Sequence, residues 1–203
     1  MFETTLVKGA KNNLALLGKS GLLKDAYLAG GTALALQLGH RISVDFDFFT
    51  PQDFNPRTFV SELSRLGSFK EEQASKGTVL GSFKGIKFSL FHYVSPLIFK
   101  TKKYCSLELA DIRDIAAMKI DAISSRGAKR DFVDVYFICK AGYTLKDLLS
   151  FYDRKYGKLA SNLVHIKKSL VYFEDAEPEK MSRMLKARSW EEIKQFFEEE
   201  VKK

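Results

Sequence analysis

A glycine pair and an Asp-x-Asp, both within residues 27–49 (YLAGGTALALQLGHRISVDFDFF), constrain the fold of this chain more than any other feature. Residues 27–29 are apolar and stop at Gly30-Gly31, which predicts a short buried strand followed by a sharp turn. A helix is expected over residues 32–38, because the pattern stays apolar until Gly39 ends it. A helix that begins at such a turn directs free N–H groups and its positive dipole end beyond the strand, where an anion is favoured.

The Asp-x-Asp lies in a segment that alternates between apolar and acidic residues. Side chains on a strand point to its two faces in turn, so Val44, Phe46 and Phe48 are expected on one face. Asp45 and Asp47 then share the other face. Two neighbouring carboxylates suit Mg²⁺, which completes its octahedron with water and phosphate oxygens. A glycine pair alone is usually a plain turn and an Asp-x-Asp alone a solvated strand face, but together they indicate a phosphate and metal site.

The combined motif resembles the signature of the DNA polymerase β-like nucleotidyltransferase superfamily, here Gly30-Gly31, thirteen residues and DFDF at 45–48. The finer pattern, GGTAL at 30–34 leading to RISVDFDFF at 41–49, resembles the AbiEii/AbiGii toxin family within it. The likeness covers nearly the whole chain, since it continues at AMK (117–119) and RGAKRDFVDVY (126–136), and more loosely at YFEDA (172–176) and Trp190.

This resemblance implies an enzyme that moves a nucleoside monophosphate from an NTP to a hydroxyl acceptor and releases pyrophosphate. It also implies an RNA acceptor, such as a tRNA 3′ end, and a cognate antitoxin protein. Mg²⁺ would be the cofactor, held by Asp45 and Asp47. The predicted catalytic residues are Asp45, Asp47, Lys119 and Asp131, and the predicted nucleotide-binding residues are Gly30, Gly31, Thr32, Arg41, Ser43, Arg126, Lys129 and Arg130.

Lys119 is the only charge on an otherwise apolar helical stripe formed by Ile112, Ile115, Ala116, Lys119, Ala122 and Ile123. One interpretation is that its ammonium group runs out to the rim of the helix and into solvent. The other is that Lys119 points into a cleft and neutralises triphosphate charge during transfer. The resemblance favours the second.

Asp131 follows Gly127, which is expected to end one helix, so a role as N-cap of a helix over 132–140 would be sufficient reason for it. Asp134 lies three residues further on and could share its face. The resemblance implies that Asp131 belongs to the site, as a base for the acceptor hydroxyl or as the partner of Lys119. The basic residues are either surface charges or a rim that grips triphosphate and RNA; this set is Lys100, Lys102, Lys103, Arg126, Lys129 and Arg130.

One departure from the superfamily concerns a third carboxylate, which commonly lies on a later strand and helps to hold a second metal. The segment expected to supply it, residues 86–92, contains no acid. Either one metal suffices, or Asp131 substitutes, or catalysis is weak. A non-catalytic binding or regulatory module with the same fold is the alternative function. An aspartyl phosphatase is a weaker one, because Phe49 stands where such enzymes usually place Thr or Val.

Composition is that of a globular protein: 203 residues, 45% hydrophobic and 29% charged, with two cysteines and three scattered histidines. The two cysteines, Cys105 and Cys139, predict neither a disulfide framework nor a zinc site. No signal peptide or membrane-spanning run is visible, so a cytoplasmic location and no membrane partner are expected. The net charge of +8 is compatible with a polyanionic partner such as RNA.

The predicted fold class is α/β (α+β), a nucleotidyltransferase-like mixed sheet with helices followed by a helical C-terminal half. Residues 1–100 would form the α/β core and residues 101–203 a helical region packed over the cleft, with the junction at 96–101. Strand signals end at Tyr93. The other predicted elements are helices at 12–19, 56–66 (capped by Asn55), 112–125, 132–140, 145–156 and 159–172, a hairpin turning at Lys84-Gly85, and a last helix opened by the capping box of Ser189 and Glu192.

Overall fold

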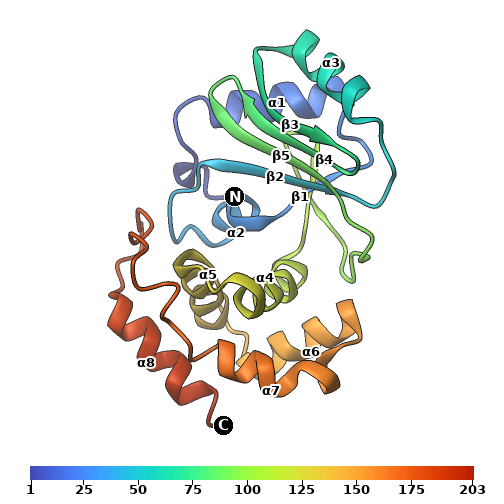
Figure 1. Cartoon of the computed structure of the whole chain (residues 1–203). Coiled ribbons are helices and arrows are strands. Elements are labelled where there is room, and N and C mark those ends of the chain that lie inside the picture. Colours follow the sequence, from blue (N-terminus) through green and yellow to red (C-terminus); the bar gives the residue numbers. More distant parts are fainter.

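A mixed β-sheet divides the helices of this protein into two groups (Figure 1). The computed structural model describes residues 1–203 apart from the side chain of Ala160. In this described part, seven strands form one sheet of order β3-β4-β5-β2-β1-β7-β6. The strands are β1 (Tyr27–Leu28), β2 (Asp45–Thr50), β3 (Phe69–Ser75), β4 (Thr78–Phe83), β5 (Ile86–His92), β6 (Lys102–Tyr104) and β7 (Leu107–Leu109).

The helices cover both faces of the sheet. Figure 1 shows α1 and α3 above the sheet, and α2, α4 and α5 below it, with the remaining helices further down. A short 3₁₀ helix (Glu3–Thr5) precedes α1. The helices are α1 (Ala10–Ser20), α2 (Gly30–Leu38), α3 (Pro56–Leu66), α4 (Ile112–Arg126), α5 (Lys129–Lys140), α6 (Leu145–Tyr156), α7 (Leu159–Ser169) and α8 (Trp190–Glu200).

Short-range sequence signals are confirmed where they were expected. The Asn55 side chain accepts a hydrogen bond from the Thr58 N–H (3.1 Å) at the start of α3. Lys84 and Gly85 both adopt positive φ (47° and 80°), as a two-residue hairpin turn between β4 and β5 requires. The capping box of Ser189 opens α8. These features form within a few residues, so no distant contact is needed to specify them.

Three strands were not predicted. β3 has a mostly polar, exposed sequence at one edge of the sheet, and β6 and β7 are each three residues long. The prediction that strand signals end at Tyr93 is wrong, because β7 is held in the sheet by parallel pairing with β1. The division at residue 100 stays a prediction, but β6 and β7 follow it and still belong to the sheet.

The core lies on both sides of β2. Phe46 and Phe48 are fully buried on one face of β2, as the alternation predicts, whereas Val44 is exposed, because it precedes the paired part of the strand. Phe48 packs against Phe88 of β5, with 5.5 Å between ring centroids. On the opposite face lies α2, which is buried along most of its length and contacts β2, α4 and α5. The sheet and the helical half therefore share α2 as a common core element.

No helix in the described part of the chain is both long and apolar enough to cross a membrane.

Candidate functional site

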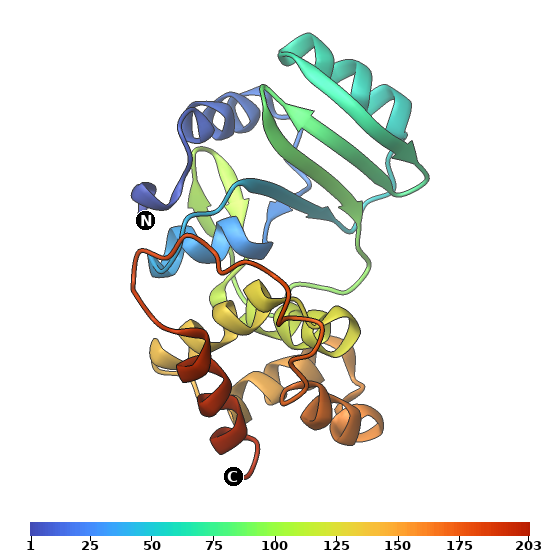
Figure 2. The same cartoon turned by 60° about the vertical axis from the view of Figure 1, so that its left-hand side comes forward.

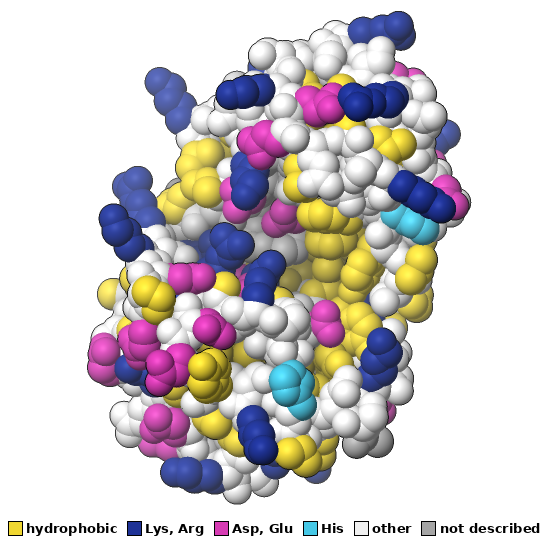
Figure 3. Space-filling model, viewed as in Figure 1, with side chains coloured by type: hydrophobic (Ala, Val, Ile, Leu, Met, Phe, Trp, Pro, Cys, Tyr) yellow, Lys and Arg dark blue, Asp and Glu magenta, His cyan; other side chains and the backbone are white. Residues whose placement is uncertain are grey.

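A cleft of about 870 Å³ runs between β2 and β5 on one side and α4 on the other. The space-filling view shows it as a hollow in the middle of the molecule, with acidic and basic side chains on one side and a hydrophobic wall on the other (Figure 3). Phe49, Phe91, Tyr93 and Tyr156 are among the residues of that wall. The cleft therefore has one charged end and one aromatic end.

Asp45 and Asp47 both face the cleft from β2, as the strand alternation predicts. Burial and the neighbouring charge of Asp45 raise the pKa of the Asp47 carboxyl. A divalent cation between the two carboxylates would offset this repulsion, and their oxygens are ligands that Mg²⁺ prefers. The described residues contain no group of three or more His, Cys, Asp or Glu placed to hold a metal. The chemistry of the two carboxylates fits Mg²⁺, which uses one or two carboxylates and takes its other ligands from substrate and water.

The turn at Gly30-Gly31 packs closely against the charged end of the cleft. Gly30 adopts φ +61°, and a Cβ built there would lie 2.8 Å from Asp47 Oδ2. A Cβ on Gly31 would lie 2.4 Å from Nη2 of Arg41. A side chain at either position would push Asp47 or Arg41 aside, so the absence of Cβ atoms lets the N-terminus of α2 approach these two residues closely.

Thr32 and Ser43, both predicted to hold phosphate, have different surroundings. Ser43 lines the cleft. Thr32 is buried and does not; its hydroxyl donates to the backbone carbonyl of Asp45 and lies within hydrogen-bond distance of the Ser43 hydroxyl (2.9 Å). Thr32 therefore ties the start of α2 to the chain leading into β2 and does not face the cleft.

Behind the glycine turn lies a buried network of charges around Asp134. The Asp134 carboxylate accepts from Arg41 Nε (2.7 Å) and Arg41 Nη2 (2.9 Å), pairs with His40 Nε2 (2.8 Å), and lies 2.7 Å from Lys119 Nζ. Although burial opposes it, the charges of Arg41 and Lys119 hold the pKa of Asp134 well below its usual value. Asp134 is therefore the anion around which the cationic side chains are arranged.

Lys119 faces this network and does not reach bulk solvent. Its ammonium group lies 2.6 Å from Asp131 Oδ1 as well as close to Asp134, and the residue is only 5% exposed. Its pKa is raised, because the two carboxylates outweigh burial. Lys119 also lines the cleft beside Asp45 and Asp47. The interpretation that it runs out to solvent is wrong, and the clamp role stays a prediction.

Asp131 is not the N-cap of α5, because that helix begins at Lys129 and its N-cap is Ala128. Asp131 instead lies in the first turn, fully buried, where Arg126 Nε donates to its Oδ2 (2.9 Å) and Lys119 to its Oδ1. Although burial opposes it, Lys119 and Arg126 lower its pKa. It therefore lies directly behind Lys119 as an ionised partner.

Only two of the six residues predicted to form a basic rim line the cleft. Arg126 and Arg130 line the cleft, but Lys129 does not, since its ammonium lies 3.2 Å from the Glu177 carbonyl and 4.9 Å from the centre of the Trp190 ring. Lys129 and Arg130 are consecutive on α5, and neighbouring side chains on a helix point in different directions, so one contacts the C-terminal segment and the other the cleft. Lys100, Lys102 and Lys103 do not line the cleft either. The last two belong to β6 at the edge of the sheet.

Several residues around the cleft were not predicted. The sequence does indicate Asp134, because it is the second acid of the Arg-Asp-x-x-Asp pattern at residues 130–134. Nothing near His40 in the sequence indicates that it pairs with Asp134. Lys87 and Ser89 of β5 stand opposite Asp45 and Asp47 in the parallel pairing. The residues of β5 that line the cleft include Lys87, Ser89 and Phe91, none of which is an acid. Ser182 and Arg183 also line the cleft, and nothing local in the sequence indicates it.

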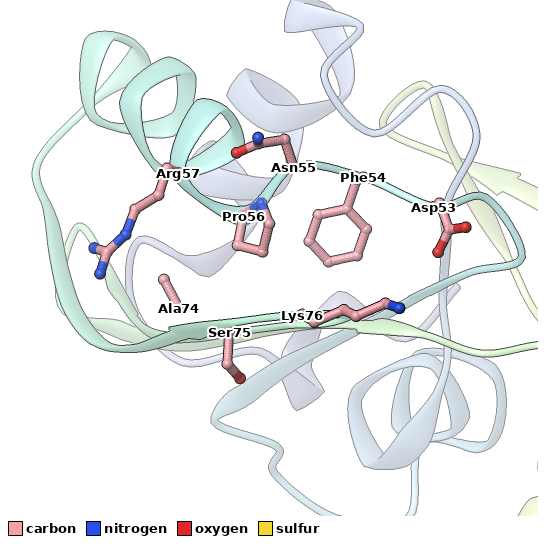
Figure 4. Close-up of a pocket in the computed structure, with 8 residues that line it drawn as sticks. All are labelled: Asp53, Phe54, Asn55, Pro56, Arg57, Ala74, Ser75 and Lys76. Carbon is pink, nitrogen blue, oxygen red and sulfur yellow. The ribbon is translucent and has the colours of Figure 1, made fainter.

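A second groove, of about 690 Å³, lies between the loop after β2 and the end of β3 (Figure 4). The Phe54 ring is turned toward β3 there, and Arg57 at its rim is paired with Glu71 (3.0 Å). None of the predicted site residues lines this groove, and it has no facing pair of carboxylates. The cleft, not this groove, is the candidate active site.

Comparison with known families and proteins places the chain among toxins. The family model described as nucleotidyl transferase AbiEii toxin, type IV toxin–antitoxin system, matches residues 14–88 and 86–203. An uncharacterised protein of Aquifex aeolicus (strain VF5) is 39% identical over 202 residues, which is 97% of this chain and 96% of that protein.

Solved structures share the fold at low sequence identity. JHP933 from Helicobacter pylori has a TM-score of 0.55 and 18% identity, covering 97% of this chain and 92% of its own. MenT4, a nucleotidyltransferase toxin from Mycobacterium tuberculosis H37Rv, has a TM-score of 0.58 and 13% identity, covering 95% and 85%. The predicted fold class, a nucleotidyltransferase-like mixed sheet with helices, is thereby confirmed.

Proposed function

The chain belongs to the AbiEii nucleotidyltransferase toxin family, and from this premise we propose that it transfers a nucleoside monophosphate from a magnesium-bound NTP to a hydroxyl group of RNA. One observation carries the proposal: Asp45 and Asp47 face the same cleft as Lys119 and the Gly30-Gly31 turn. Carboxylates for a metal, a helix N-terminus for phosphate and a buried cation are thus available to one bound nucleotide.

Mg²⁺, held by Asp45 and Asp47, would neutralise charge on the phosphates as pyrophosphate departs. The acceptor oxygen forms a bond to the α-phosphorus, the bond from that phosphorus to the bridging oxygen breaks, and pyrophosphate leaves with the electron pair. The hydroxyl proton is released to solvent. The backbone N–H groups at Gly30-Gly31 and the hydroxyl of Ser43 orient the β- and γ-phosphates, so that the α-phosphorus stays beside the carboxylate pair.

In this scheme Asp131 positions Lys119 and does not abstract the acceptor proton. Its pKa is lowered by Lys119 and Arg126, and a carboxylate with a lowered pKa is a weak base. The ion pair instead fixes the ammonium group of Lys119 at the cleft wall, where it can offset charge developing on the phosphates. Of the two roles that the sequence left open for Asp131, the partner of Lys119 is the one proposed.

RNA is proposed as the acceptor because the chain carries a net charge of +8 and the cationic side chains Arg126 and Arg130 stand at the cleft. The type IV toxin–antitoxin description of the family supports a cognate antitoxin as the protein partner.

The test is transfer of label from each α-³²P NTP in turn to total RNA with Mg²⁺ present. Wild type should label RNA with at least one NTP, and Asp45→Asn or Asp47→Asn should lower the rate by at least about 10²-fold. Asp53→Asn, a matched control on the exposed loop after β2, should keep the wild-type rate. Wild type that binds NTP but labels nothing would refute transfer to RNA and favour a binding or regulatory role.

A further inference from the structure

The segment before α8 is held beside the glycine turn by its backbone. Within this strap, defined as residues 180–186, the Arg183 carbonyl accepts from the Ile42 N–H (2.8 Å) and the Leu185 N–H donates to the His40 carbonyl (2.9 Å). Arg41 and Met184 also form an antiparallel bridge. Figure 2 shows this part of the chain, in red, running past α2.

The strap is anchored at its far end as well. Lys186 Nζ donates to the Leu38 carbonyl (2.7 Å) at the end of α2. At the start of this anchored stretch, Ser182 and Arg183 line the cleft, as do Ser43 and Val44. A segment some 140 residues away in sequence therefore contributes two side chains to the phosphate end of the site.

The cations of the cleft differ in what they already bind. Six line it, but Arg41, Lys119 and Arg126 are each paired with Asp131 or Asp134. The other three are Lys87, Arg130 and Arg183, and within the described part of the chain none of them has a carboxylate partner within ion-pair distance. The buried acids partly offset the charge of the paired cations, whereas the charge of Lys87, Arg130 and Arg183 is not offset by a carboxylate at ion-pair distance and is fully available to a polyphosphate.

Of these three, Arg183 is the one that the strap carries, next to residues 41–43, which contact the glycine turn. Its backbone pairs with Ile42, whose neighbours Arg41 and Ser43 both lie against the position of a Gly31 Cβ. Its side chain is exposed and makes no hydrogen bond or ion pair with described residues. A guanidinium group presents paired N–H donors that match two phosphate oxygens.

We propose that Arg183, carried by the strap, binds the terminal phosphates of the nucleotide together with the N–H groups of Gly30-Gly31. This inference rests on the proposed function, because it assigns a residue to the polyphosphate subsite of the same cleft. The strap makes that subsite depend on the C-terminal region, which supplies a charge that the α/β core does not provide at this position.

The test is calorimetric titration with Mg²⁺ and inorganic tripolyphosphate, which has no base or sugar. Arg183→Ala should weaken tripolyphosphate binding about tenfold or more, the scale of one charge-assisted contact, and Arg183→Lys should restore part of it. Lys180→Ala removes an exposed charge from the same strap outside the cleft and should bind like wild type. Because Arg183 is exposed and the strap is held by its backbone, thermal melts of all variants should coincide.

Three results would overturn the assignment. The first is that Arg183→Ala and Lys180→Ala bind tripolyphosphate with equal affinity, and the second is that wild type does not bind it. The third is that Arg183→Ala loses affinity only for a short RNA oligonucleotide titrated in parallel, which would assign Arg183 to the acceptor. RNA labelling separates this inference from the proposed function. Tripolyphosphate binding that needs Arg183 in a protein that labels no RNA would support the anion subsite and refute transfer.

Discussion

Replacing Asp134 with Asn tests whether the buried charge network holds the fold together. The substitution keeps the shape of the side chain but removes the charge that Arg41, Lys119 and His40 share. His40 is fully buried and Arg41 and Lys119 are each only 5% exposed, so water can replace little of what the lost carboxylate provides. Removing one partner of a buried ion pair typically costs about 3–5 kcal/mol. For a chain of this size, that corresponds to a Tm lowered by about 6–20 °C.

The assay is thermal unfolding followed by circular dichroism, with Glu71→Gln as the control. Glu71 pairs with Arg57 at the surface, where side chains are 33% and 75% exposed, so its loss should cost under about 1 kcal/mol. A Tm of Asp134→Asn within about 2 °C of wild type would refute the reasoning, because the cations would then be satisfied without this carboxylate.

The Tm of wild type and that of Asp134→Asn should depend differently on pH. The pKa of Asp134 is lowered by folding, so its stabilising effect is complete above the ordinary value of 3.8 and is lost as the pH falls from there through the folded-state pKa. The Tm gap between wild type and Asp134→Asn should therefore be full at neutral pH and narrow below about pH 4. A gap that widens on acidification would contradict this assignment.

Three further changes test the site and the fold. Lys119→Met should slow RNA labelling by at least about 10²-fold, and an unchanged rate in a protein that still folds would exclude the clamp role. Gly30→Ala should weaken binding of Mg²⁺-NTP, because the added methyl would lie 2.8 Å from Asp47 Oδ2 and displace that carboxylate. Gly85→Ala, which meets only open space, should keep binding and lose only about 1–2 kcal/mol of stability. Ser189→Ala should remove the N-cap of α8 and lower the Tm by about 2–4 °C in a melt, with no effect on labelling.

Most of the predicted site residues meet in the cleft. Some are placed there by local chain geometry, and others by contacts between segments that are far apart in the sequence. Asp45 and Asp47 share a face because strand geometry alternates every residue, and Gly30-Gly31 marks the turn that must approach them. These relations lie within one continuous segment, so the sequence was sufficient. Thr32 and Lys129 do not reach the cleft, because packing against Ser43 and against the C-terminal segment decides where their side chains go.

The sequence by itself determined the helices, the hairpin and the carboxylate pair, because caps, turns and alternation depend on neighbours a few residues away. Only the tertiary structure decided that His40 and Arg41 meet Asp134, more than 90 residues later, and that the strap brings Arg183 to the same cleft. It also decided that β7 joins the sheet beside β1. Contacts at this range form because burial of the whole core brings the segments together, and no local pattern encodes which distant charge each will meet.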